Sequence, residues 1–191
     1  GAHAAVVRAG AEHGAERLGT TLVALAVHHG HVVIVHVGDS RAYRLRDGEL
    51  EQLTRDHTVR AELDAAGVSH ATAEQARVRL DALTAYLGSG FPPGFRAATF
   101  SVMGGDRFLL CSDGLFNEVD RPTLVATLTE VADPDEAAAR LVELANAGGG
   151  RDNITCVVAD VTEDGGRAEK AAAVAAAAAA STAAAVAATD D

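Results

Sequence analysis

The sequence predicts an α+β fold in which antiparallel sheets pack together and helices lie on the outside. Segments with strand character occur in two groups, separated by segments with helical spacing rather than alternating one for one with helices. Short turns of the hairpin type divide these groups, which favours antiparallel pairing. Apolar residues make up 48% of the 191 residues, so one domain of this length can bury a sizeable core.

Residues 20–53 predict an antiparallel meander of four strands. Its turns are His29-Gly30 and Asp47-Gly48, and an Asp-Gly pair between two short strands is a strong hairpin signal. The first two strands are continuous apolar runs, which is typical of strands covered on both faces. The Ala-rich residues 4–18 are compatible with a helix. The four strands are expected at 21–27, 32–37, 41–46 and 49–53.

Residues 57–80 have helical spacing and predict two helices. The first is expected to end at Gly67, because glycine commonly follows the last turn of a helix. The second is expected to begin at Thr72, because Thr72 and Gln75 have the spacing of a capping box.

The last part of the domain predicts a hairpin, two helices and a strand. Each helix has an Asp at its N-cap and a Pro close behind, Asp120 with Pro122 and Asp133 with Pro134. The second helix has an apolar stripe and ends at the glycine run 148–150, which indicates a helix C-cap. The hairpin strands are expected at 97–103 and 107–111, with the turn at 104–106, and the last strand at 154–161.

The composition of the chain changes beyond Thr162. Residues 171–188 are all Ala except for two Val, one Ser and one Thr. Ala contributes little to membrane insertion, so a helical or frayed low-complexity tail is expected rather than a membrane span. We therefore divide the chain into a domain at 1–162 and an Ala-rich tail at 163–191.

Charge and composition exclude several classes of function. The 16 Lys and Arg against 27 Asp and Glu give a formal net charge of −11, and aromatic residues are 4% with no Trp. These values argue against a general nucleic-acid binder and against binding to anionic lipid. The two cysteines, Cys111 and Cys156, lie in apolar runs, which indicates reduced core thiols. No basic-led apolar leader opens the sequence, and we expect a cytoplasmic monomer.

Three carboxylates stand at the ends of expected strands. Asp113 follows the apolar run 107–111, Asp152 precedes the last strand, and Asp56 follows the strand at 49–53. Oxygen ligands on rigid strand ends suit a hard cation such as Mg²⁺ or Mn²⁺, because they converge at little entropic cost. Each of these residues alone is more simply a turn residue, so the spacing leaves both interpretations open.

Other polar residues fit structural roles better than functional ones. His28, His29 and His31 surround a turn, but neighbouring strand residues point to opposite faces, which favours a solvated hairpin tip over a metal cluster. His36 lies in an apolar strand and is expected to be a core histidine with its hydrogen bonds satisfied. The glycine run 148–150 follows a helix, so it faces the wrong end of the helix dipole for binding a phosphate.

Six short segments are more specific together, in their order along the chain, than any of them is alone. They are Gly19-Thr20-Thr21, His36-Val37-Gly38-Asp39-Ser40-Arg41, Leu53-Thr54-Arg55-Asp56-His57, Leu83-Thr84, 109–115 (LLCSDGL) and 149–155 (GGRDNIT). In this order they resemble the metal-dependent protein phosphatase family, the type 2C serine/threonine phosphatases, and most closely its bacterial branch. The resemblance covers roughly residues 15–162 and leaves the tail outside.

This resemblance implies a fold and a site. The fold would be a β-sandwich of two antiparallel sheets flanked by antiparallel helix pairs, four layers in the order α-β-β-α, with a binuclear metal site at one end. Asp113 and Asp152 match core metal ligands, and Asp56 matches a residue that helps to hold a third, weaker metal. The cofactors would be two or three Mn²⁺ or Mg²⁺ ions. Residues 39–41 match a motif that we interpret as mainly structural, and residues 57–82 correspond to a mobile flap.

The resemblance also implies an activity, the hydrolysis of phosphoserine and phosphothreonine in proteins. Two cations would lower the pKa of a bridging water, which attacks phosphorus in line, so no side chain forms a covalent intermediate. The partners would be phosphorylated proteins, namely serine/threonine kinases and their substrates, with no nucleic acid and no membrane.

The chain departs from the family pattern at its start. The family has an upstream segment with a phosphate-binding Arg, an acidic pair and an Asp-Gly-x-Gly-Gly motif, whereas residues 1–18 contain no Asp and no such motif occurs in the chain. We therefore expect the C-terminal two-thirds of a phosphatase domain, N-terminally incomplete and inactive alone. The alternatives are a non-catalytic phosphatase-like binding or regulatory module and a phosphatase of a sigma-factor control pathway.

Overall fold

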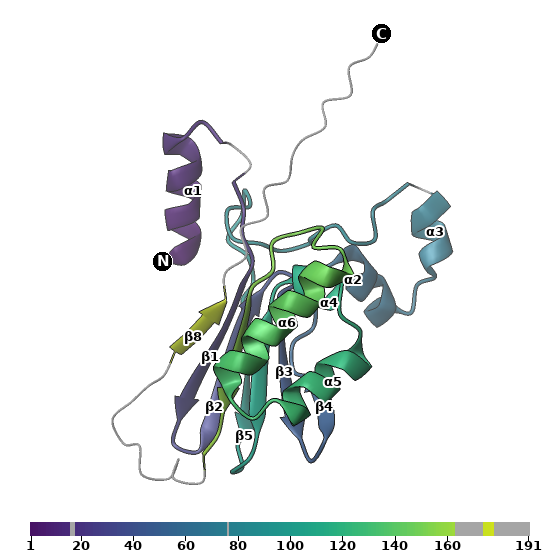
Figure 1. Cartoon of the computed structure of the whole chain (residues 1–191). Coiled ribbons are helices and arrows are strands. Elements are labelled where there is room, and N and C mark those ends of the chain that lie inside the picture. Colours follow the sequence, from purple (N-terminus) through teal and green to yellow (C-terminus); the bar gives the residue numbers. More distant parts are fainter. Residues whose placement is uncertain (16–17, 76, 163–173, 178–191) are drawn as a thin grey trace.

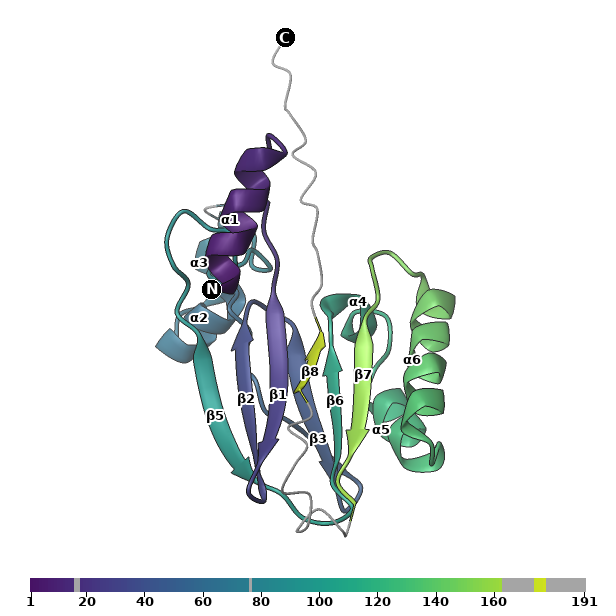
Figure 2. The same ribbon diagram turned by 90° about the vertical axis from the view of Figure 1, so that its left-hand side faces the viewer.

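Two four-stranded antiparallel sheets pack face to face, which confirms the predicted α+β sandwich (Figure 1; Figure 2). The computed structural model describes residues 1–15, 18–75, 77–162 and 174–177. The strand order is β5-β2-β1-β8 in the first sheet and β4-β3-β6-β7 in the second. The strands of the first sheet are β1 (Leu22–His28), β2 (His31–Val37), β5 (Arg96–Ser101) and β8 (Val174–Ala177). Those of the second are β3 (Arg41–Arg46), β4 (Glu49–Gln52), β6 (Arg107–Cys111) and β7 (Cys156–Asp160).

Strand β6 lies in the middle of the core and is buried along its whole length. Phe108 and Leu110 point between the sheets, whereas Leu109 and Cys111 point toward the helices, as the two-residue period of a strand requires. The helices on that outer face are α5 (Arg121–Glu130) and α6 (Pro134–Gly148) (Figure 1). These two layers of apolar contact hold the second sheet from both sides.

The first sheet is covered differently from the expectation. Strands β1 and β2 alternate between buried and half-buried residues, so the prediction that both faces of 21–27 and 32–37 are covered is wrong. Helix α1 (Ala2–Glu12) begins and ends earlier than the expected 4–18 and lies beyond the end of this sheet rather than on its face (Figure 2). Alternate side chains of β1 and β2 therefore keep partial contact with solvent.

The predicted turns are confirmed, but the predicted meander is wrong. His29 and Gly30 join β1 to β2, Asp47 and Gly48 join β3 to β4, and all four residues have positive φ, as tight hairpin turns require. Between the two hairpins the chain crosses from one sheet to the other at residues 38–40.

A close backbone approach shapes this crossing. Gly38 has φ +101° and packs so closely on Thr21 that a Cβ would lie 2.3 Å from the Thr21 methyl group. The hydroxyl of Thr21 is 2.7 Å from that of Ser40, which ties the far side of the crossing to the start of β1.

The second predicted hairpin, 97–103 with 107–111, is also wrong. Strand β5 pairs with β2 in the first sheet, whereas β6 pairs with β3 and β7 in the second. Asp106 fixes the chain where it enters the second sheet, because its buried carboxylate accepts two hydrogen bonds of 2.6 Å from Arg46 at the end of β3. The Met103 amide also donates to Asp106, at 2.8 Å. Arg46 in addition donates to the Ser101 carbonyl at the end of β5, at 3.2 Å, so the turn is held to both sheets.

Most of the predicted helix ends are confirmed. Helix α2 (Val59–Ala66) ends at Gly67 with φ +66°, and the Asp120 and Asp133 carboxylates cap α5 and α6 by accepting from backbone amides at 2.9 Å. Helix α3 (His70–Gln75), however, begins two residues before the predicted start at Thr72. The Ser69 hydroxyl accepts from the Ala71 amide at 3.3 Å, so the cap comes earlier than the capping-box spacing indicated.

The Ala-rich tail contains a strand where a helical or frayed segment was expected. Residues 174–177 form β8 and pair antiparallel with β1, so that expectation is wrong for these four residues. The exposed edge of β1 provides backbone hydrogen bonds, which outweigh the helix propensity of Ala. The rest of the expected tail, 163–173 and 178–191, lies outside the described residues. Within the part of the chain that the structure describes, no helix is long and apolar enough to cross a membrane.

Candidate metal site

One end of the sandwich gathers the three carboxylates that the sequence singled out, together with a fourth, Asp39. Strand β2 leads to Asp39, β4 leads to Asp56, and β6 leads to Asp113, which opens the short helix α4 (Asp113–Phe116). The loop between α6 and β7 carries Asp152 to the same end (Figure 1; Figure 2). Asp39 and Asp113 each lie within two residues of a strand end, whereas Asp56 and Asp152 lie in short loops.

Three of these carboxylates act on one another electrostatically. Burial, and then the charge of Asp113, raise the pKa of Asp39 to about 6. Burial, and then the charge of Asp152, raise the pKa of Asp113. Asp39, Asp113 and Asp152 therefore form a chain of neighbouring negative charges, which is the arrangement that a divalent cation relieves. Within the described residues, no three His, Cys, Asp or Glu side chains lie close enough to hold a metal ion by themselves.

Ser112 joins the segment of Asp113 to the segment of Asp152. Its buried hydroxyl donates to the Asn153 carbonyl at 3.1 Å and accepts from the Thr155 amide at 3.0 Å. The backbone amide of Ser112 donates to the Thr155 carbonyl, also at 3.0 Å. At Gly114 a Cβ would lie 2.4 Å from the Asn153 carbonyl oxygen, so only glycine allows this approach. These contacts fix the two loops against one another.

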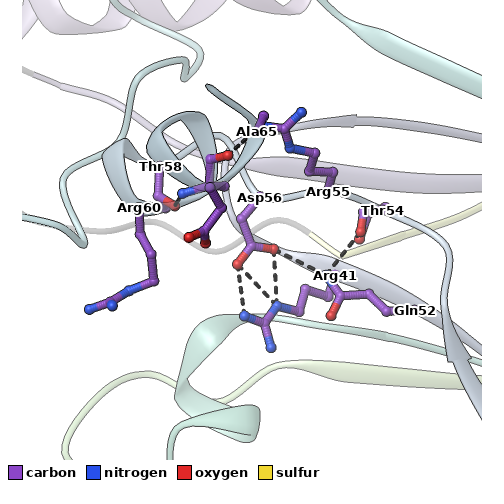
Figure 3. Close-up of a pocket in the computed structure, with 10 residues that line it drawn as sticks. Arg41, Gln52, Thr54, Arg55, Asp56, Thr58, Arg60 and Ala65 are labelled. Atoms are coloured by element: carbon purple, nitrogen blue, oxygen red, sulfur yellow. Dashed lines mark hydrogen bonds and ion pairs between the residues drawn. The ribbon is translucent and has the colours of Figure 1, made fainter. Parts of the chain in front are cut away.

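Asp56 lies at the edge of this cluster and is engaged by Arg41. Its carboxylate accepts hydrogen bonds from Arg41 Nε at 3.0 Å and Nη2 at 2.7 Å, and it faces a pocket of about 530 Å³ (Figure 3). Arg41 also donates to the Tyr43 hydroxyl at 3.1 Å and lies 3.6 Å from the centre of the Phe116 ring. The charge of Asp56 contributes to the raised pKa of Asp39, but its hydrogen bonds join it to Arg41.

Asp39 is the carboxylate whose setting the sequence reasoning missed. The sequence predicts a mainly structural role for the motif 39–41, and the structure places Ser40 and Arg41 in structural contacts. Asp39, however, is partly buried beside Asp113 and has the most strongly raised pKa among the Asp and Glu residues that the structure describes. The signal that could have found it is the one used for Asp113, a carboxylate shortly after an apolar strand.

The histidines and cysteines keep to the structural roles that the sequence indicated. His36 is buried, lies 2.9 Å from the Arg55 carbonyl through Nε2 and stacks on His57, with ring centres 4.9 Å apart. Burial lowers the pKa of both rings. Cys111 and Cys156 are free thiols opposite one another on β6 and β7. Within the described residues, none of these His and Cys side chains forms a hydrogen bond with Asp39, Asp113 or Asp152.

The fold and the site together define a class of protein, an α+β sandwich with neighbouring carboxylates at one end. The family model of protein phosphatase 2C matches residues 2–147. The chain belongs to this family, as the resemblance implied.

Relatives and solved structures agree with this assignment. The chain is 41% identical over 149 residues to the serine/threonine protein phosphatase PstP of Mycobacterium tuberculosis, covering 78% of this chain and 28% of PstP. It is 35% identical to the serine/threonine phosphatase Stp of Listeria monocytogenes, covering 78% of this chain and 60% of Stp.

Among solved structures, the crystal structure of M. tuberculosis PstP matches with a TM-score of 0.70 and 37% identity, covering 84% of this chain and 68% of that one. The catalytic domain of PstP in complex with two manganese ions matches with a TM-score of 0.69 and 38% identity, covering 84% and 66%. The chain thus spans between about a quarter and three-fifths of the length of these curated relatives.

Proposed function

We propose that this chain is part of a protein phosphatase that hydrolyses phosphoserine and phosphothreonine in a reaction that depends on Mn²⁺ or Mg²⁺. The observation that carries the proposal is the group of neighbouring carboxylates Asp39 and Asp113, which follow strand ends, and Asp152, which lies in the loop before β7. Relatives named as serine/threonine phosphatases, one of them solved with two manganese ions, support it.

The residues present fit one side of a hard-cation site. Carboxylate oxygens are the ligands that Mn²⁺ and Mg²⁺ prefer, and the mutual repulsion of Asp39 and Asp113 is relieved when a cation binds. The carboxylates of the described residues would need further oxygen ligands to complete a site for two ions, or for the three that the family resemblance implies. When bound, the ions would polarise the phosphoryl group and activate a water molecule.

The chain's own residues have distinct tasks in this proposal. Asp113 and Asp152 would hold the ions, and Ser112 keeps the two loops that carry them in contact. Asp39 would join them as a third carboxylate. The predicted role of Asp56 as a ligand of an outer ion would require Arg41 to release it, since Arg41 holds both of its oxygens.

The test is phosphatase activity of the full-length protein that carries this chain, with a phosphothreonine peptide as substrate. We expect hydrolysis that depends on added Mn²⁺ and that falls by several hundredfold or more in Asp113→Asn and Asp152→Asn, because each change removes a charged metal ligand. Asp135→Asn, which changes an exposed carboxylate in the first turn of α6, is the matched control and should retain full activity. Normal turnover in Asp113→Asn would contradict the proposal.

A non-catalytic phosphopeptide-binding module is the second candidate. The observation in its favour is that no three potential ligands converge within the described residues. It predicts binding of the phosphothreonine peptide without release of phosphate at any Mn²⁺ concentration. Phosphorylated kinases and their substrates as partners, the monomeric state and a cytoplasmic location remain predictions from the sequence.

A further inference from the structure

Glu118, two residues beyond α4, has a buried carboxylate with an exposed partner. Its side chain is 3% exposed, whereas that of Arg151, which holds it, is 76% exposed. Arg151 donates from Nε to Glu118 Oε1 at 2.8 Å and from Nη2 to Oε2 at 3.1 Å. This bidentate contact lowers the pKa of Glu118 and joins the end of α4 to the loop between α6 and β7.

The glycine run 148–150 is shaped around Glu118. A Cβ at Gly148 would lie 2.8 Å from the Glu118 carbonyl oxygen, and a Cβ at Gly149 would lie 2.9 Å from Glu118 Oε2. Gly149 also has φ +148°, which L-residues with a side chain rarely adopt. The run therefore does more than end α6, because it lets the loop close over the Glu118 side chain.

Asp152 lies between two points at which this loop is fixed. On its N-terminal side Arg151 is held by Glu118, and on its C-terminal side Asn153 accepts a hydrogen bond from the Ser112 hydroxyl at 3.1 Å. Asp152 itself is exposed, and its Oδ1 accepts from the amide of Asn153 at 2.7 Å. Since its own side chain is not packed in the core, its position depends on these two neighbours.

We propose that Glu118, acting through Arg151, is a positioning residue that holds the Asp152 carboxylate where it meets the metal ion. This inference rests on the proposed function, because it requires Asp152 to be a metal ligand. Partners that orient metal ligands from behind commonly contribute ten- to a hundredfold in metal affinity. The exposed Arg151 guanidinium covers the buried carboxylate and at the same time anchors the residue next to the ligand.

The test measures the Mn²⁺ affinity of the full-length protein that carries this chain, with Mn²⁺ alone as the probe, from the paramagnetic resonance signal of the free ion. The variants are Glu118→Gln, Arg151→Gln, the double variant and Asp152→Asn. The matched control is Arg140→Gln, which breaks an exposed Arg–Glu pair of 3.0 Å with Glu143 on α6. Urea unfolding of each metal-free protein separates a loss of metal affinity from a loss of stability.

We expect Glu118→Gln and Arg151→Gln each to weaken Mn²⁺ binding roughly tenfold, and the double variant to be no weaker than either. Arg140→Gln should match the wild type.

If Asp152→Asn weakens Mn²⁺ binding but both single variants, Glu118→Gln and Arg151→Gln, bind as the wild type does, the positioning role is overturned while the proposed function stands. If Asp152→Asn binds Mn²⁺ normally, both are overturned. An affinity loss that follows the unfolding free energy across all variants would also overturn the positioning role. Should Glu118→Gln fail to fold, Arg151→Gln tests the positioning role alone, because Arg151 is exposed and its substitution does not disturb the core.

Discussion

Asp39 and Asp113 leave strands of different sheets, yet the negative charge of Asp113 acts directly on the carboxyl group of Asp39. Together with burial it raises the pKa of Asp39 to about 6, from an ordinary value of 3.8. The folded, metal-free protein therefore binds a proton at Asp39 more tightly than the unfolded chain does. Stability from this residue is present at acidic pH and is lost as pH rises through about 6.

Replacing Asp39 by Asn should remove this pH dependence. At pH 7.5 the wild type without metal carries an unfavourable charge that the variant lacks, so Asp39→Asn should be more stable by up to about 3 kcal/mol. At pH 4 the difference should largely vanish. Urea unfolding at the two pH values in the presence of a chelator measures it. A variant that is equally destabilised at both pH values would show that Asp39 has a packing role instead.

Asp39 and Asp56 differ in their expected effect on metal binding. Asp56 is already neutralised by Arg41, whereas Asp39 is destabilised by a neighbouring carboxylate. We therefore expect Asp39→Asn to weaken Mn²⁺ binding by roughly tenfold or more and Asp56→Asn to weaken it less. Mn²⁺ titrations of the two variants under the same conditions make the comparison. The reverse order would assign the outer ion to Asp56, as the sequence implied.

The Arg41–Asp56 pair should matter for stability. Both side chains are less than one quarter exposed. Arg41→Ala would remove three hydrogen bonds from the half-buried carboxylate and leave one, from Gln52 at 3.3 Å. We expect a loss of about 1–3 kcal/mol in the free energy of unfolding. Arg79→Ala is the matched control, because its pair with Asp81 is exposed on both sides and should change little. Equal effects of the two substitutions would contradict this expectation.

Gly114→Ala should damage both the fold and the site. The new Cβ would meet a backbone carbonyl, that of Asn153, at 2.4 Å, and backbone atoms cannot move aside as a flexible side chain can. We expect a loss of about 1–3 kcal/mol or more and weaker Mn²⁺ binding, because the loops of Asp113 and Asp152 would separate. Gly94→Ala, where a Cβ has open space, should leave both quantities unchanged.

The two thiols should be unreactive in the folded protein. Burial raises the pKa of Cys156 to about 11 and raises that of Cys111 as well, so about one Cys156 in a thousand is a thiolate at pH 8. Ellman's reagent should therefore react with these thiols, and produce its yellow product, only after urea has unfolded the protein. Rapid labelling of the native protein would show that β6 and β7 open readily.

The sequence predicted those features that depend on neighbouring residues. The positive-φ turns at Asp47-Gly48 and the caps at Asp120 and Asp133 are set within a few residues, and the structure confirms them. The pairing of 97–103 with 107–111 was wrong because a strand pattern does not say which sheet a strand joins. The observed pairing of β6 with β3 is accompanied by a contact between Asp106 and Arg46, 60 residues apart in the chain, which local spacing does not reveal.

For the site, too, the sequence predicted only those features that depend on neighbouring residues. Carboxylates next to predicted strands, such as Asp113 and Asp152, are visible in the order of residues alone. The raised pKa of Asp39 depends on burial and on a charge 74 positions further along the chain, and neither is visible locally. Nothing in the spacing of Glu118 marks it as a partner of Arg151, because that contact exists only after the glycine run closes over it.

The two passages of the chain from one sheet to the other have a mechanical consequence. Because residues 38–40 and 102–106 each connect one sheet to the other, neither sheet can separate without disrupting its neighbour. Thermal unfolding should then be a single cooperative transition. The end of the sandwich that carries the carboxylates should lose its structure together with the rest of the domain, without a partly folded intermediate.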